Sequence, residues 1–335
     1  MRKPIFPLTL GLSAAVFCFL SAVSAEPLPT FETFRQIDRT RRLTGQLQTA
    51  ELLKATRLDP ELITGVVRQG INDAHLAWGA AELLADWPLR RTQFEAALAA
   101  TGTNKLIALR FACAAARQRE YDLALQWARY CKDKDPDNLV PWLVESWVLV
   151  ERRQRSQLAQ ALPVWVIHYR DYTVEACEMR FLVLERAGFS PYAARRLGFK
   201  PDSDALLIAS ELCHPPVEEM LRLLLKQTAD SLELRRQFLV NELVGQTLER
   251  TLYALHTDLE MQTVARARKE AIAGRREQLK QLLADMERNV VEAASESQLV
   301  QYYDNILAFG EEEAMHKLTA VVRPAAPAGN APTGN

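Results

Sequence analysis

The sequence predicts an all-α protein, and three features support this. Ala, Leu, Glu, Arg and Gln dominate the 335-residue chain, and all five are good helix formers. Glycine is scarce, with 13 residues, and the alternation of apolar and polar residues that is typical of strands is rare. Helix-start and helix-stop residues follow one another at short intervals. The loops between helices are therefore short, which favours antiparallel helical hairpins.

The first segment, 1–25, has the pattern of a secretory signal peptide. Arg2 and Lys3 give it a positive start, and the apolar run "IFPLTLGLSAAVFCFL" follows. Small residues at Val23 and Ala25 then suit a cleavage site. We expect cleavage after Ala25, with an uncleaved N-terminal anchor as the alternative. The mature protein is therefore predicted to be exported, either periplasmic or secreted.

Composition and charge are those of a folded soluble protein. Apolar residues make up 48% and charged residues 25%. The formal net charge of −1 becomes slightly more negative when the basic start is removed, which does not suggest nucleic acid or an anionic membrane surface as a partner. Export permits disulfides, but no CxxC pair occurs and each remaining cysteine lies in an apolar helical context. Disulfide pairing is left open for Cys113, Cys131, Cys177 and Cys213.

Helix boundaries can be read in order along the first 200 residues. Cap residues, first-turn prolines and terminal glycines mark them. The starts are Asp59-Pro60, Asn72-Asp73, Pro88, Asn104 and Ser190-Pro191, and Gly70 closes the first of these helices.

The stretch "REYDLALQWARYCKDKDPDN", 119–138, is one half of a predicted repeated unit. A helix-length apolar run precedes it, and another, "NLVPWLVESWVLVERR", follows. Small residues recur at Gly79, Ala112 and Ser146, at intervals of 33 and 34 residues. Such a period is typical of helix-turn-helix solenoid repeats.

Particular residues in 105–138 match one repeat family. The matching positions are Phe111-Ala112 in the first helix, Ala124 and Cys131 as small residues of the second, Pro136 at the end, and Trp142 early in the next unit. With these residues the segment resembles a tetratricopeptide repeat (TPR). Small residues let two helices approach closely, and the proline stops the second helix.

The resemblance is clear in one unit and partial on either side. Ala115 replaces the usual tyrosine of the first helix, and Ala128 replaces a usual aromatic residue. Pro163 falls where the second helix of the following unit should run, which puts that unit in doubt.

The resemblance implies a concave face that binds a protein or peptide partner. The residues that would face it are largely apolar, and the predicted binding residues are Leu106, Leu109, Val140, Leu143, Trp147 and Val150. An exposed apolar groove marks either a binding site or a region covered by the protein's own chain. We expect a later helix, from within 204–257, to pack on this face, because a tethered segment has a high effective concentration. An open partner groove is the alternative.

The pattern changes in 201–322, which is predicted to be a C-terminal helical domain. A long, charged helix is expected over 260–294, either in a hairpin or as a coiled coil, and its apolar stripe approximates a heptad seam. The stripe residues are Leu279, Leu282, Leu283, Met286, Val290 and Ala294. Ser295 begins a capping-box pattern, and Gly310 ends the next helix. The segment 323–335 is predicted to be disordered.

Catalytic and metal-binding signatures are absent or weak. No dinucleotide, phosphate-loop or zinc-protease motif occurs. Two Glu-x-x-His pairs, Glu211 with His214 and Glu313 with His316, have the spacing used in di-iron bundles. Both lie at predicted helix ends rather than mid-helix, so neither a metal nor another cofactor is expected. Ser190, in "GFSPY", is predicted to be a helix cap rather than a nucleophile.

Together these features predict a non-catalytic, exported protein–protein interaction scaffold. The expected organisation is a signal peptide at 1–25, a TPR-like array at 26–200, a C-terminal helical domain at 201–322 and a tail. The alternatives are a structural envelope protein that self-associates through its long C-terminal helix, and a helical enzyme whose site is not recognised.

Overall fold

The computed structural model of the protein is helical, which confirms the all-α class. The structure describes residues 28–43, 60–70, 72–154, 156–158, 168–201, 203–213, 221–234, 238–254 and 259–322. The predicted signal peptide and C-terminal tail lie outside these ranges, as does Pro163. Within them the chain forms helices and turns, with one isolated bridge between Asn138 and His168.

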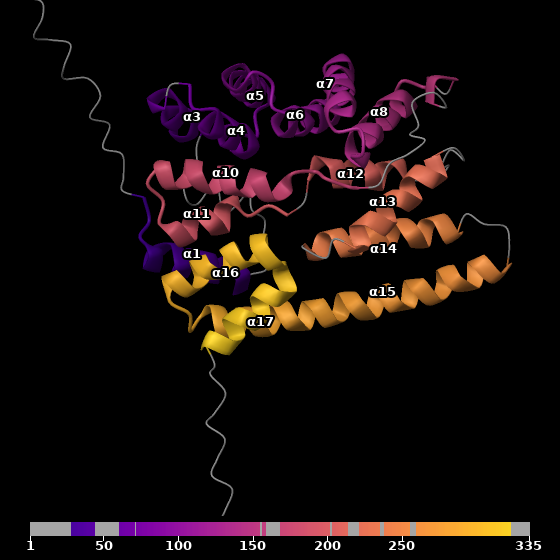
Figure 1. The fold of residues 1–335 in the computed structure, drawn as a ribbon. Helices are drawn as coiled ribbons and strands as arrows, with labels where there is room; N and C mark the ends of the chain where they lie inside the picture. The colour runs from indigo at the N-terminus through magenta and orange to yellow at the C-terminus, as the bar shows by residue number, and fades with distance from the viewer. Residues whose placement is uncertain are drawn as a thin grey trace, which may run out of the picture.

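The first layer contains six helices that pack in sequence, along the top of Figure 1. α4 lies against α5, α6 against α7, and α7 against α8. Their bounds are α3 (Pro60–Gln69), α4 (Ala74–Leu83), α5 (Trp87–Thr101), α6 (Lys105–Arg117), α7 (Tyr121–Lys134) and α8 (Leu139–Glu151).

Side-chain caps fix where several of these helices begin. Asp73 accepts the His75 N–H at 2.9 Å at the start of α4, and Asn104 accepts the Leu106 N–H at 2.8 Å at the start of α6. These contacts satisfy backbone donors that the first turn leaves free. α5 begins one residue earlier than predicted, because Asp86 is its cap and Pro88 occupies its second position.

A second layer contains α10 (Thr173–Arg186), α11 (Pro191–Gly198) and α12 (Asp204–Leu212), and it lies beneath the first in Figure 1. α10 crosses α4 at Gly79, where an added Cβ would lie 2.2 Å from the carbonyl oxygen of Met179. Glycine is therefore required there for close approach. α12 packs against both α6 and α8.

The C-terminal helices form further layers below. Their bounds are α13 (Arg222–Leu234), α14 (Leu239–Ala254), α15 (Leu259–Asp285), the π-helix η2 (Met286–Val291), α16 (Glu296–Phe309) and α17 (Glu311–Val322). α15 and η2 make up the predicted long helix, and α15 packs on α14. The predicted capping box at Ser295 is present.

Most of the heptad seam of the long helix is buried by other helices of the same chain. Leu279, Met286 and Val290 are buried, although Leu283 is 41% exposed. Arg275 pairs with Glu242 of α14 at 3.0 Å. The long helix thus packs on helices of the same chain: α15 lies against α14, and η2, which carries Met286 and Val290, lies against α17.

Two apolar cores hold the layers together. The first joins α4–α8 to α12, α13 and α14, and the second joins α3, α4, α10 and α11 to α14–α17 and to α1 (Phe31–Leu43). Both include residues from each side of the boundary predicted near 200. Among the described helices, none combines the length and apolar character that a membrane crossing needs.

Candidate functional site

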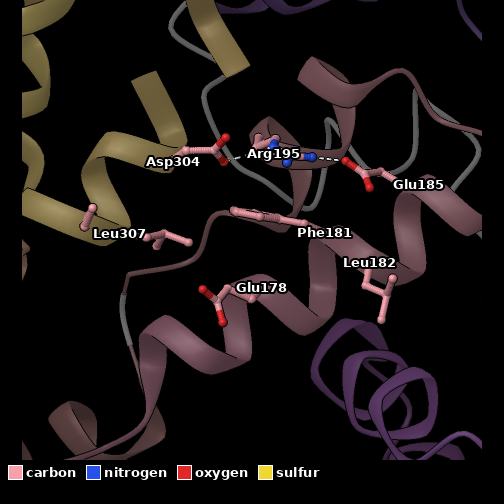
Figure 2. A pocket seen from close by; sticks show the side chains of 8 residues that line it. Glu178, Phe181, Leu182, Glu185, Arg195, Asp304 and Leu307 are labelled. Atoms are coloured by element: carbon pink, nitrogen blue, oxygen red, sulfur yellow. Dashed lines mark hydrogen bonds and ion pairs between the residues drawn. The ribbon is translucent and has the colours of Figure 1, made fainter. Parts of the chain in front are cut away.

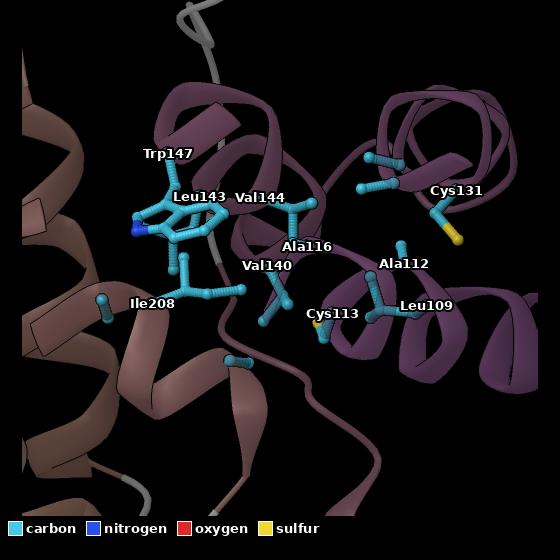
Figure 3. Packing of buried hydrophobic residues seen from close by; sticks show 14 of the residues in the cluster. Leu109, Ala112, Cys113, Ala116, Cys131, Val140, Leu143, Val144, Trp147 and Ile208 are labelled. Carbon is cyan, nitrogen blue, oxygen red and sulfur yellow. The ribbon is translucent and has the colours of Figure 1, made fainter. Parts of the chain in front are cut away.

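The six residues predicted to line a binding face lie on α6 and α8. Leu109, Val140 and Leu143 are at most 1% exposed and Trp147 is 6% exposed, and these four lie in the packed interior (Figure 3). Leu106 and Val150 are half-buried against the same cluster. All six residues therefore belong to one core cluster or pack against it.

The cover over this face is α12, a helix from the segment expected to pack here. Ile208 is fully buried and faces the α8 side chains, whereas its neighbour Leu207 is 43% exposed (Figure 3). Trp147 donates its indole N–H to Glu211 at 3.0 Å, and Arg117 pairs with the same carboxylate.

Opening this face would be costly. Leu206, Ile208 and Leu212 of α12 are all buried, and they belong to the core cluster that α12 shares with α6 and α8. Burial of each such side chain contributes about 1.5–3 kcal/mol, so their exposure alone would cost roughly 5–9 kcal/mol. A partner that binds without displacing α12 must therefore use another face, and a binding role for the six residues stays a prediction.

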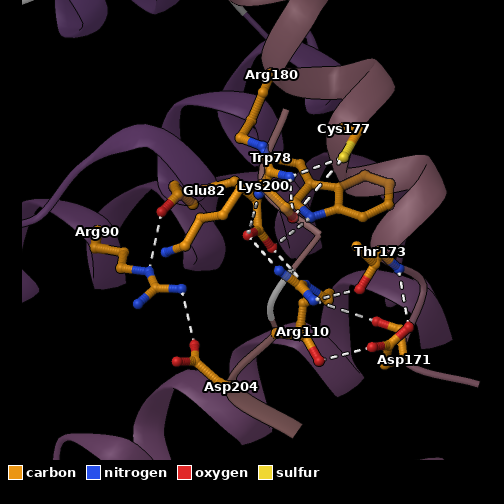
Figure 4. Close-up of polar contacts among 12 residues, drawn as sticks. Trp78, Glu82, Arg90, Arg110, Asp171, Thr173, Cys177, Arg180, Lys200 and Asp204 are labelled. Atoms are coloured by element: carbon orange, nitrogen blue, oxygen red, sulfur yellow. Dashed lines mark hydrogen bonds and ion pairs between the residues drawn. The ribbon is translucent and has the colours of Figure 1, made fainter. Parts of the chain in front are cut away.

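A buried ion cluster lies at the junction of α4, α6 and α10 (Figure 4). Arg110 donates to both carboxylate oxygens of Glu82, at 2.7 and 2.6 Å. The Nη1 atom of Arg180 lies 3.5 Å from the same carboxylate, and Trp78 donates its indole N–H to it at 3.4 Å. The bidentate geometry is the strongest form of this ion pair.

Burial and charge act against each other at this cluster. Burial alone would raise the pKa of Glu82, but the charges and hydrogen bonds of Arg110, with the charge of Arg180, bring this pKa far below its usual range. The same carboxylate keeps the pKa of Arg110 well above its usual value despite burial. Both partners therefore stay ionised at any physiological pH.

The cluster has a structural role. Arg180 also donates to the carbonyl oxygens of Gly198 and Lys200, at 2.6 and 3.0 Å, so it ties α10 to the chain that leads into α12. Arg90 pairs with Asp204 at the start of α12 at 3.2 Å. These contacts hold the second layer on the first.

The four described cysteines are free thiols, and all are buried. Burial raises the pKa of Cys113 well above its usual value and that of Cys131 to about 12. Such thiols are poor nucleophiles, because the thiolate is the reactive form.

Metal-binding geometry is not found among the residues described. No group of three or more His, Cys, Asp or Glu side chains there is placed to hold an ion. Glu211 is engaged by Trp147 and Arg117, and His214 lies outside the described ranges. Glu313 pairs with Lys317 on the exposed side of α17.

An open cleft of about 370 Å³ lies between α10, α11 and α16 (Figure 2). Its apolar lining comes from Phe181, Leu182, Leu307 and Ala308, and its polar lining from Glu178, Glu185, Arg195 and Asp304. Arg195 pairs with both Glu185 and Asp304 and lies over the Phe181 ring.

Glu178 differs from the other charged residues of the cleft. Within the described parts of the chain, no basic side chain pairs with it. Partial burial raises its pKa, and the nearby carboxylates of Glu175 and Asp304 raise it further. A cation placed in the cleft would relieve this repulsion.

Comparison with known proteins gives no relationship. No protein-family model matches the chain, no curated protein matches it, and no solved structure matches it. The functional argument therefore rests on the geometry described above.

Sequence reasoning missed both the ion cluster and the cleft. The cluster had a local signal, because Glu82, Arg110 and Arg180 are single charges inside otherwise apolar helix faces. Charges in such places are usually paired. The cleft had none, since its α16 residues are more than 100 positions from its α10 and α11 residues in the sequence.

Proposed function

We propose that this protein is an exported, non-catalytic scaffold that binds a protein partner. The N-terminal pattern of 1–25 supports export, and the TPR-like residues of 105–138 support a role in protein interaction. The expected cleavage after Ala25 is tested by fractionating cells and measuring the mass of the mature chain, which should begin at Glu26.

The partner face we propose is the cleft between α10, α11 and α16, rather than the face that α12 covers. The observation that supports this choice is that the open cleft combines an apolar lining with the Glu178 carboxylate, which pairs with no basic side chain of the described residues. Leu182 and Leu307 supply apolar area, and Glu178 supplies a negative charge with which no basic side chain of the described residues pairs. A partner segment with a lysine or arginine beside an apolar residue matches both features.

Photocrosslinking in the native envelope tests this proposal. A photoreactive amino acid at Leu182, in the cleft, should yield one discrete crosslinked protein, whereas the same group at Leu89 on α5 should not. Glu178→Lys should reduce the yield at least threefold. The matched control Glu270→Lys, on the exposed side of α15, should leave it unchanged.

The identified partner is then purified and its affinity measured directly. We expect Glu178→Lys to weaken binding at least tenfold, because it replaces an attraction by a repulsion. Equal crosslinking from Leu182 and Leu89, or an affinity insensitive to Glu178→Lys, would contradict the assignment of this face. Self-association through the long helix has less support, because most of its apolar stripe is buried within the chain.

A further inference from the structure

An aromatic pocket, separate from the proposed partner cleft, lies between α11, η2, α16 and the first residue of α17. Its cavity encloses about 260 Å³, and none of its lining residues lines the cleft. Apolar side chains such as Met286 and Ile306 form part of the wall. The lining residues that matter for its chemistry are Tyr192, Arg196, Phe199, Tyr302, Tyr303 and Glu311.

Three aromatic rings form walls of this pocket at different orientations. The centroid of the Tyr303 ring lies 5.5 Å from that of Phe199 and 5.3 Å from that of Tyr302, with angles of 56° and 63° between the ring planes. Phe199 and Tyr302 are only half-buried, so parts of both rings stay accessible. The face of an aromatic ring carries partial negative charge and attracts a cation. Rings set at such angles can therefore surround a positively charged group.

Glu311 adds a carboxylate that has no countercharge in the described structure. It is half-buried, and its Oε2 atom accepts the backbone N–H of Leu239 at 3.3 Å. Its other oxygen, Oε1, accepts from no donor of the described residues and is not sealed from solvent. Burial raises the pKa of Glu311 to about 7, and the Leu239 N–H is the group that opposes this rise. A carboxylate in apolar surroundings is normally paired, so a cation in the pocket would complete this site.

Arg196, the cation that lines the pocket, already has its own carboxylate. Its Nε atom lies 3.3 Å from the carboxylate of Asp38, which is 1% exposed. Asp38 also accepts a hydrogen bond from the Tyr192 hydroxyl at 3.4 Å. The charge of Asp38 raises the pKa of Arg196, whereas Arg196 does not act on the pKa of Glu311. The charge of Arg196 is therefore balanced, and that of Glu311 is not.

We propose that the aromatic pocket binds a small quaternary ammonium ion. The methyl groups of the ligand pack on the rings of Phe199, Tyr302 and Tyr303. The positive charge of the ligand lies beside the carboxylate of Glu311 and supplies the countercharge that this group lacks.

The lining disfavours other classes of ligand. An anion would be repelled by Glu311, and Arg196 is already paired with Asp38. A neutral apolar molecule would leave Glu311 without a countercharge. A primary ammonium has three N–H donors that need acceptors, whereas Glu311 is the one carboxylate among the described residues that line the pocket. A quaternary ammonium has no N–H donor, so a single carboxylate and aromatic walls suit it.

Isothermal titration of the full mature chain with tetramethylammonium and with choline tests the proposal at pH 8, where the Glu311 carboxyl is ionised. At least one of the two should bind saturably with one site per chain. The neutral alcohol in which carbon replaces the choline nitrogen has the same shape, and it should bind at least tenfold more weakly than choline. Failure of both cations to bind at millimolar concentration, or equal binding of the neutral alcohol, would overturn the proposal.

Substitutions then locate the site. Glu311→Gln keeps the shape of the side chain and should weaken binding at least tenfold, because it removes the charge that faces the ligand. Tyr302→Leu removes one ring and should also weaken binding. The matched control Glu313→Gln, on the exposed side of α17, should leave the affinity unchanged. Circular dichroism confirms that each variant is folded. Undiminished affinity in the folded Glu311→Gln variant would place the cation elsewhere and overturn the assignment.

Discussion

Replacing Glu82 by Gln tests the buried ion cluster at its centre. The substitution preserves the shape of the side chain but removes the carboxylate that contacts both Arg110 and Arg180. The side chains of Glu82 and Arg180 are each 2% exposed, and that of Arg110 is 6% exposed, so water does not replace the lost charge.

The expected loss is large. Removing one partner of a buried pair typically costs about 3–5 kcal/mol, because an uncompensated charge remains inside. At about 2 °C per kcal/mol for a chain of this length, the melting temperature should fall by roughly 6–10 °C. The arginines keep the folded pKa of Glu82 below its unfolded value of 4.5, so its contribution is complete above that pH and is lost in acid.

Thermal melting by circular dichroism, at pH 7 and at pH 4 or below, measures both effects. Glu95→Gln is the matched control, because Glu95 forms an exposed pair with Arg91 on α5. That variant should melt within about 1 °C of the unsubstituted protein, since exposed pairs contribute little. The reasoning would be refuted if Glu82→Gln and Glu95→Gln melted at the same temperature. It would also be refuted if the melting-temperature difference between Glu82→Gln and the unsubstituted protein did not become smaller in acid.

Three further predictions concern other parts of the fold. Gly79→Ala places a Cβ against Met179 and should lower the free energy of unfolding by about 1–3 kcal/mol, as measured with denaturant. The control Gly274→Ala, whose Cβ meets open space, should raise it by up to about 1 kcal/mol. Equal effects of the two substitutions would contradict the close α4–α10 crossing. Burial raises the pKa of Glu311 to about 7, above its unfolded value of 4.5. Only the folded carboxyl holds its proton between these values, so stability falls as pH rises through them. Glu311→Gln should remove this pH dependence of stability and stabilise the protein at pH 8 by about 2–3 kcal/mol. Urea unfolding measures the stability, and a pH dependence that survives the substitution would contradict the raised pKa of Glu311. Ala112→Leu should overpack the core around α6 and lower the free energy of unfolding by about 1–3 kcal/mol. An unchanged melting temperature would count against close packing at Ala112.

Local signals explain why much of the fold was predictable. A cap such as Asn104 or Ser295 acts within three residues of itself, so its sequence neighbours suffice to place a helix start. The long helix was also predicted, because its apolar stripe and charged face repeat over many turns. Its last part is the π-helix η2, which no sequence feature had indicated.

The arrangement of the layers was harder to predict, because it depends on contacts between distant segments. α12 is only nine residues long, yet it closes the face formed by α6 and α8. The apolar character of Leu109 and Trp147 showed that this face needed a cover, but it did not show which helix would supply it. The predicted boundary near 200 likewise separates segments that share two cores.

The cleft proposed as the partner face depends on geometry that a linear pattern does not contain. Glu178 is an ordinary helix residue until α16 brings Asp304 near it. The informative property is the state of this side chain after folding.

The central claim is that α12 closes the inner face of the helical array, so that a partner binds elsewhere. Fluorine NMR of the 5-fluorotryptophan-labelled full chain tests it most directly, with Trp147 assigned by Trp147→Phe and a soluble nitroxide as the probe of exposure. The Trp147 signal should resist broadening in the unsubstituted protein and in Leu207→Asp, and it should become sensitive in Ile208→Asp. A Trp147 signal that broadens in the unsubstituted protein as strongly as free 5-fluorotryptophan would contradict the claim.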